Sequence, residues 1–309
     1  MIMMLMLMLM LAVVAPSVVP VVQGKTNNPC DGLPKKKCKN KKECTFFSSA
    51  FFYNNQCYLT AGDGSIVRDG SKNVAPGTLC TVGGGQQNRA GYLDFYPAYS
   101  VIGAGVDNLC VGDKSTISEG KKNIIFSISL SEGITSEYDT ISGGSSNGIT
   151  DSTSAAITGG GGDDLKGEGN SISYGDTSTI SGGKQNIVVG SGNTLTGGFN
   201  NVVSYPGTPN DCVVTGGNSN NARNQGSVVV GGQFNTADGK NSLALGQNAV
   251  TKYDHSMVVN LMDDEKPLKA TQEGHFLVNA NSFRFQVGNG ESATLTSENI
   301  NRLKKELLE

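Results

Sequence analysis

Short aliphatic stretches separated by glycine and asparagine recur along the chain from about Thr81 to Val250. In Ser178-Thr179-Ile180-Ser181 polar and apolar residues alternate, so Ile180 points to one side and its neighbours to the other, as in a strand with one buried face. A Gly-Gly pair then turns the chain, and a second short strand follows at Ile187-Val188-Val189, in which Val188 faces inward again. Each repeat is therefore predicted to be one coil of two strands and two turns.

Nine copies of the repeat share the same offsets around an anchor residue, which is asparagine in all copies but one. The anchors are Asn88, Asn108, Asn123, Asn147, Asp163, Asn186, Asn201, Asn220 and Asn235. Three residues before the anchors stand Gly85, Gly105, Gly120, Gly144, Gly160, Gly183, Gly198, Gly217 and Gly232, and Gly246 follows in a last copy. Six residues before them stand Val82, Ile102, Ile117, Ile141, Ile157, Ile180, Leu195, Val214 and Val229. Two residues after them stand Ala90, Cys110, Ile125, Ile149, Leu165, Val188, Val203, Ala222 and Ala237.

These offsets predict an all-β fold, a parallel β-solenoid. Glycine supplies positive φ without a Cβ penalty and asparagine tolerates the left-handed region, so both are interpreted as turn residues. The spacing is as short as the 15 residues from Asn108 to Asn123, and a coil that small is stable only when neighbouring coils stack on it. Longer gaps hold insertions, which we expect as loops on one face that carry specificity. They are Val111 to Ser115, Phe126 to Asp139, Lys166 to Thr177 and Ser204 to Asp211.

The last copy has a different sequence, Asn241-Ser242-Leu243-Ala244-Leu245-Gly246-Gln247-Asn248-Ala249-Val250. It resembles the N-S-x-A-[IVL]-G repeats in the heads of trimeric autotransporter adhesins, the YadA-like family, and the segment from Val228 to Ala237 resembles the G-G-x-x-N variant of that head. The resemblance implies a left-handed parallel β-roll, a homotrimer of chains packed side by side, and adhesion to extracellular matrix or surface ligands. The family's long stalk and membrane anchor are not recognisable in this sequence, so autotransport is not carried over.

The start of the chain, from Met1 to Val22, is almost wholly apolar, and Val22-Gln23-Gly24 suits cleavage after Gly24. Residues 1–24 are therefore interpreted as a signal peptide, with a retained membrane anchor as the alternative. Either interpretation predicts a secreted, extracellular or cell-surface protein, and cleavage of the signal predicts no stable membrane insertion.

Residues 25–79 are predicted to form a disulfide-stapled module, because four of the seven cysteines crowd this segment. The disulfide candidates are Cys30, Cys38, Cys44, Cys57, Cys80 and Cys110. The odd number leaves one thiol unpaired or paired between chains, and zinc is the competing interpretation of the cluster. The tract from Pro34 to Lys42 carries six lysines and is either a solvated loop or a contact for anionic surfaces.

Residues 80–250 are assigned to the repeat domain, 251–296 to a strand-rich cap, and 297–309 to a helix. The clearest strands of the cap are Ser256 to Leu261 and Phe283 to Val287. In the helix Ile300, Leu303 and Leu307 share one side, which fits either the beginning of a trimeric coiled coil or a helix docked on its own domain.

Composition and charge exclude several classes of function. A net charge of −3 gives no basis for nucleic-acid binding, and 42 glycines with no tryptophan do not fit an ordinary mixed globule. His255 and His275 are the only histidines, and no nucleophile motif stands beside them, so we predict no catalysis, no cofactor and no metal. Gly159 to Leu165 is similar to one calcium-binding nonapeptide, and Asp263 to Glu265 is a solvated loop or a cation site.

Three hypotheses for function remain. The first is an adhesive or structural head that binds an extracellular glycan or a matrix or surface protein multivalently. The second is a carbohydrate-active or carbohydrate-binding β-helix, which needs paired carboxylates for catalysis. The third is an ice- or mineral-binding solenoid, for which we do not expect flat T-x-T ladders. Its support comes from Thr140, Thr158, Thr179, Thr194, Thr196 and Thr215.

Overall fold

The computed structural model describes residues 51–53, 56–58, 65–68, 70–91, 99–126, 136–162, 169–204, 211–262, 266–286, 292–296 and 298–302. The chain divides into two compact units, Met1–Leu59 and Thr60–Glu309. In the first unit β1 (Phe51–Tyr53) pairs with β2 (Gln56–Tyr58) in antiparallel orientation. The second unit contains the repeat.

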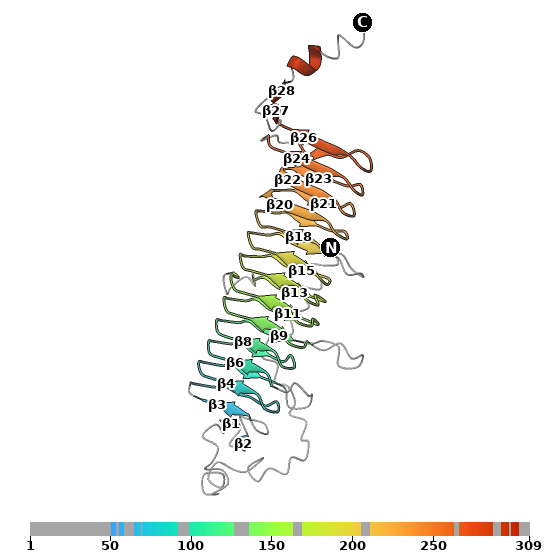
Figure 1. Cartoon of the computed structure of the whole chain (residues 1–309). Coiled ribbons are helices and arrows are strands. Elements are labelled where there is room, and N and C mark those ends of the chain that lie inside the picture. Colours follow the sequence, from blue (N-terminus) through green and yellow to red (C-terminus); the bar gives the residue numbers. More distant parts are fainter. Residues whose placement is uncertain are drawn as a thin grey trace. The chain divides into compact units, whose positions relative to one another are not determined.

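The second unit is a stack of short parallel strands in two sheets (Figure 1). The first sheet has 13 strands: β3 (Ile66–Val67), β4 (Thr81–Val82), β6 (Val101–Ile102), β8 (Thr116–Ile117), β10 (Thr140–Ile141), β12 (Ala156–Ile157), β14 (Thr179–Ile180), β16 (Thr194–Leu195), β18 (Val213–Val214), β20 (Val228–Gln233), β22 (Leu243–Gln247), β24 (Met257–Asn260) and β26 (Phe276–Asn279). The second has 11: β5 (Arg89–Ala90), β7 (Leu109–Cys110), β9 (Ile124–Phe126), β11 (Gly148–Thr150), β13 (Ser171–Ser173), β15 (Ile187–Val189), β17 (Val202–Ser204), β19 (Asn221–Ala222), β21 (Thr236–Ala237), β23 (Ala249–Thr251) and β25 (Leu268–Lys269).

Consecutive strands of each sheet are parallel and in register, as in Ile141 beside Ile157 and Ile149 beside Ile172. The chain alternates between the sheets, so each coil contributes one strand to each. The prediction of a parallel β-solenoid is confirmed.

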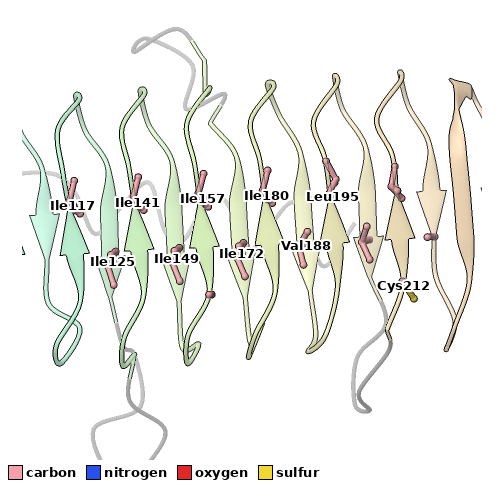
Figure 2. Packing of buried hydrophobic residues seen from close by; sticks show 14 of the residues in the cluster. Ile117, Ile125, Ile141, Ile149, Ile157, Ile172, Ile180, Val188, Leu195 and Cys212 are labelled. Carbon is pink, nitrogen blue, oxygen red and sulfur yellow. The ribbon is translucent and has the colours of Figure 1, made fainter.

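The core consists of two aliphatic columns, one from each sheet. Ile117, Ile141 and Ile157 follow one another along the first column, and Ile125 and Val188 lie in the second (Figure 2). All of these side chains are fully buried. The alternation of polar and apolar positions therefore predicted the inward residues correctly.

The stack extends beyond the repeat in both directions. Ile66 and Val67 pair with Thr81 and Val82, so a rung precedes residue 80. At the other end β24 and β26 continue the first sheet, and Val258 is buried like the aliphatics before it. The strand predicted near Ser256 to Leu261 is therefore part of another coil.

The rest of the C-terminal part pairs differently. β27 (Ser282–Gln286) and β28 (Ser292–Thr296) form an antiparallel pair, which includes most of the strand predicted from Phe283 to Val287. Of the predicted helix, 298–302 are helical, and 303–309, with Leu303 and Leu307, lie outside the described residues.

One anchor of the repeat was assigned wrongly. Asn170 makes the same hydrogen bonds as the other anchors: its N–H donates to Asn147 Oδ1, and its own Oδ1 accepts the N–H of Asn186. Ile172, two residues later, lies in the core column. Asp163 and Leu165, which were chosen for these places, lie outside the described residues. The coil accommodates extra residues between Gly160 and Asn170, so the fixed offset fails there.

The insertions also differ from the prediction. Val111 to Ser115 is an ordinary connection from β7 to β8, and Lys166 to Thr177 contains strand β13. The remaining long connections do not share one side, because those after β9 and β17 lead from the second sheet to the first, whereas that before β13 leads from the first to the second.

Candidate binding surface

The anchor asparagines are buried ladder residues and not turn residues. The left-handed backbone conformation falls on the residue before each one except Asn170, for example Gln185 with a φ of 59° before Asn186. The Nδ2 group of Asn186 donates to the carbonyl oxygens of Gly182 and Gly198 at 3.0 Å each. Its Oδ1 accepts the N–H of Asn201 at 3.1 Å. An amide supplies both donors and an acceptor here, so the ladder has a structural role. Its members are Asn73, Asn88, Asn108, Asn123, Asn147, Asn170, Asn186, Asn201, Asn220 and Asn235.

The glycines three residues before most anchors are required by coil stacking. Gly183 has a φ of 84°, and a Cβ there would collide with the carbonyl oxygen of Gly198 in the next coil. The same steric conflict recurs along the column of glycines, so none of these positions has room for a side chain. The column comprises Gly85, Gly105, Gly120, Gly144, Gly160, Gly183, Gly198, Gly217, Gly232 and Gly246.

Two disulfide candidates lie inside the stack as thiols. Cys80, Cys110 and Cys212 are buried and form no disulfide within the part of the chain that the structure describes. Burial raises the pKa of Cys110 to about 12, and its Sγ lies 3.4 Å from the carbonyl oxygen of Ser115. Cys110 thus acts as a small core residue in the second aliphatic column, which explains why the disulfide prediction was wrong for it and for Cys80. Cys30, Cys38 and Cys44 lie outside the described residues, and Cys57 is on β2.

Asp139 is a buried acid that the sequence pattern does not predict. It occupies the polar column that precedes the strands of the first sheet, where Ser115 and Ser178 stand in other coils. Its Oδ1 accepts the N–H of Ala155 at 2.9 Å, and its buried Oδ2 has no hydrogen-bond partner among the described residues. Burial raises the pKa of Asp139 to about 7.

The outer face of the first sheet carries two columns of small side chains over β8 to β18. Thr194 and Thr196 flank the buried Leu195, and equivalent pairs stack in register above and below them. Thr194 and Thr196 form the one Thr-x-Thr pair of these six coils, so the columns are not a T-x-T ladder, as the sequence predicted. The first column is Thr116, Thr140, Ala156, Thr179, Thr194 and Val213, and the second is Ser118, Ser142, Thr158, Ser181, Thr196 and Thr215.

The same face becomes apolar over β20 to β26. Val230 is 39% exposed and Phe276 is 64% exposed, although both belong to strands of the stack. No charged side chain occupies the two outward columns from β8 to β26. The outward residues of the apolar part are Val228, Val230, Leu243, Leu245, Met257, Val259, Phe276 and Val278.

The outer side of the second sheet and its neighbouring residues are mixed in character. Arg223 lies 3.5 Å from Asp238, and Lys269 is exposed on β25. The outward residues of β7 to β17, such as Ile124 and Ile187, are uncharged as well. The uncharged strip of the first sheet is longer, from β8 to β26, and we therefore take it as the candidate binding surface.

The two histidines considered for chemistry are not among the outward residues of this surface. His255 is exposed, and its Nδ1 lies 3.0 Å from Glu273 Oε1, while His275 Nδ1 lies 3.4 Å from Thr271 Oγ1. Among the described residues no three His, Cys, Asp or Glu side chains gather as a metal site would require. Asp263 to Glu265 lie outside the described residues, as does most of the calcium-like segment after Gly162. No helix in the described ranges is long and apolar enough to cross a membrane.

Comparison with known proteins gives no assignment. No family model matches the chain, and no curated protein matches it.

Proposed function

We propose that this protein is a secreted adhesive or structural head that assembles as a homotrimer and binds extracellular surface or matrix ligands multivalently. The observation that carries the proposal is the uncharged outer face of the first sheet, which runs from β8 to β26. Identical chains packed side by side need a surface of this kind, because a charge on it would be brought close to its own copies.

The apolar part of the face gives the strongest support. Eight outward aliphatic, methionine or phenylalanine side chains on four consecutive strands form a patch that a soluble monomer would leave in water. In the segment that resembles the YadA-like repeat, Ala244 is buried whereas Leu243 and Leu245 point outward. The motif thus supplies one core residue and two residues for contact with another chain, which agrees with a trimeric β-roll of the left-handed type.

Secretion and adhesion rest on further features. The apolar segment from Met1 to Val22 supports export, and the regular stack offers many equivalent positions to an extended ligand. Trimerisation would multiply weak contacts of each head through effective concentration. The proposed ligands are glycans or matrix and surface proteins, and no step of the proposal involves catalysis.

The test measures the mass of the assembled protein and its binding to candidate ligands. The chain is expressed with its first 24 residues and collected from the medium of secreting cells, and its N-terminus is sequenced. Light scattering after size-exclusion chromatography should give three times the chain mass, and arrays of matrix proteins and glycans should yield ligands whose binding weakens when the trimer is dissociated. A monomer that binds nothing on either array contradicts the proposal.

The threonine and serine columns favour a second candidate, an ice-binding solenoid. Threonine is stiff at χ1, and the two columns, in which threonine and serine predominate, are uncharged and in register from coil to coil, as a lattice of water requires. Trimerisation through the first sheet would cover this array, so the two candidates exclude each other. A monomer with thermal hysteresis supports the ice-binding candidate, and a trimer without it supports the adhesive head.

A further inference from the structure

One edge of the solenoid carries an exposed row of large side chains. Tyr99, Lys114 and Tyr138 occupy the same corner in three consecutive coils, where the chain turns into β6, β8 and β10. Both tyrosines are 52% exposed, and the side chain of Lys114 is 41% exposed. We call these three residues the tyrosine ridge.

The fold requires the left-handed corner, which recurs in the other coils, but it does not require exposed aromatic rings there. The φ angles are 66° at Tyr99, 49° at Lys114 and 56° at Tyr138, in the left-handed region that bulky residues avoid. In later coils the equivalent corner is occupied by small or polar residues that also have a positive φ. These residues are Ser154, Thr177, Gly192, Asp211, Gly226, Asn241, His255 and Gly274, and Leu79 occupies the corner in the coil before the ridge. Strained positions that return little burial are a feature of binding sites.

The polar groups of the ridge hold it in place and neutralise its charge. Lys114 Nζ donates to Tyr138 Oη at 3.1 Å and lies 4.8 Å from the centre of the Tyr138 ring. The same ammonium group lies 3.3 Å from Asp113 Oδ2. An ammonium group has three donors, so one remains for a ligand. Because Asp113 offsets the charge of Lys114 and Glu137 is adjacent, the ridge does not suit a polyanion.

The spacing of the rings indicates the shape of the ligand. Successive coils are one strand spacing apart, so Tyr99 and Tyr138 are separated along the stack by about 9.6 Å. This distance is close to the length of two pyranose rings in an extended polysaccharide. The exposed ring faces can pack against the C–H face of a sugar, and Lys114 can donate to a sugar hydroxyl.

We infer that the tyrosine ridge binds a neutral, extended glycan chain whose alternate sugars pack on Tyr99 and Tyr138. This inference rests on the proposed function, because it names the ligand class of an adhesive head. It places the ligand at an edge of the coils and not on the outer face of the first sheet, so it is compatible with trimerisation.

The experiment uses the full secreted chain and isothermal titration calorimetry with cellohexaose and chitohexaose, with a heparin hexasaccharide as the charged comparison. The test variant is Tyr99→Asn with Tyr138→Asn, since asparagine suits a left-handed corner. The matched control is Tyr174→Asn, because Tyr174 is 57% exposed and has a φ of 51° but lies outside the ridge. Circular dichroism confirms that each variant is folded.

At least one neutral hexasaccharide should bind the unchanged chain, and its Kd should rise about tenfold or more in the double variant, while the control stays within about twofold. Binding of neither neutral hexasaccharide overturns the inference, as does equal binding by the double variant. Tighter, salt-sensitive binding of heparin overturns it as well, because the ligand would then be anionic. A trimer that still binds matrix proteins in any of these cases leaves the proposed function standing without the ridge.

Discussion

At the residue scale, the buried asparagine ladder is the most specific device in the fold. In Asn186→Asp the side chain loses the donors for the carbonyl oxygens of Gly182 and Gly198 and brings a negative charge beside them. We expect a loss of about 3 kcal/mol or more in the free energy of unfolding, measured by urea denaturation at neutral pH.

The matched control for this change is Asn200→Asp. Asn200 is exposed in the neighbouring coil, has a φ of 54°, and makes an exposed side-chain hydrogen bond to Ser219 Oγ at 3.2 Å. Aspartate tolerates that conformation, so the free energy of unfolding should change by less than about 0.5 kcal/mol. Equal effects at the two positions would show that the ladder is not the source of the stability.

The buried carboxyl group of Asp139 makes stability depend on pH. Its pKa is raised from 3.8 to about 7 in the folded chain by burial, with Asp176 adding to the effect. The folded state therefore holds a proton that the unfolded state releases between these values. The stabilising contribution is complete below pH 4 and is lost as the pH rises to 7, by an amount on the order of a few kcal/mol.

Asp139→Asn should remove this dependence, because Asn keeps an acceptor for the N–H of Ala155 but carries no charge. Urea unfolding at pH 5 and pH 8 should show a smaller difference for the variant than for the unchanged chain, with the gain at pH 8. A variant that is destabilised equally at both pH values would contradict the assignment of a buried charge.

At the scale of the coil, glycines that the sequence cannot distinguish have different roles. Gly183→Ala should prevent native stacking or cost several kcal/mol, since the methyl group would strike the carbonyl oxygen of Gly198 and the φ of 84° is unfavourable. Gly159→Ala should be tolerated, because nothing lies within 4 Å of a methyl group there. Thermal unfolding followed by circular dichroism compares the two, and equal midpoints would refute the stacking role.

The strands could be predicted because each repeat shows the same alternation at the same offsets. Two inward columns, with residues such as Ile180 and Val188, follow directly from that period. The role of the asparagines could not be predicted, because Asn suits both a turn and a ladder. The residue that takes the left-handed conformation varies widely, from Lys122 to Ser146 and Phe234, and so carries no sequence signal.

The register of coils that are separated by an insertion also could not be predicted from the sequence. A stack requires only that Asn170 lies above Asn147, whatever number of residues precedes it, so a fixed offset selected Asp163 instead. The columns on the outer face of the first sheet could not be predicted for the same reason. Each Thr-x-Ser pair is visible by itself, but its alignment with the pair in the next coil depends on connections of unequal length.

At the scale of the whole molecule, the outer face of the first sheet decides how chains assemble. We predict that Leu245→Lys with Val259→Lys converts the proposed trimer to a monomer, since both side chains point outward from the apolar part of that face. Three copies of each ammonium group would be brought together, and like charges at an interface cost several kcal/mol. The core residues Ala244 and Val258 are unchanged, so the solenoid itself should remain folded.

The matched control is Val250→Lys, which introduces the same side chain at a half-buried outward position of the second sheet. Light scattering after size-exclusion chromatography should give a monomer mass for the double variant and a trimer mass for the control, with similar circular dichroism spectra. Dissociation by the control alone would place the interface on the second sheet. A trimer that survives the double variant would show that the apolar strip is not where the chains meet, and its exposed leucine and valine side chains would then belong to a different partner.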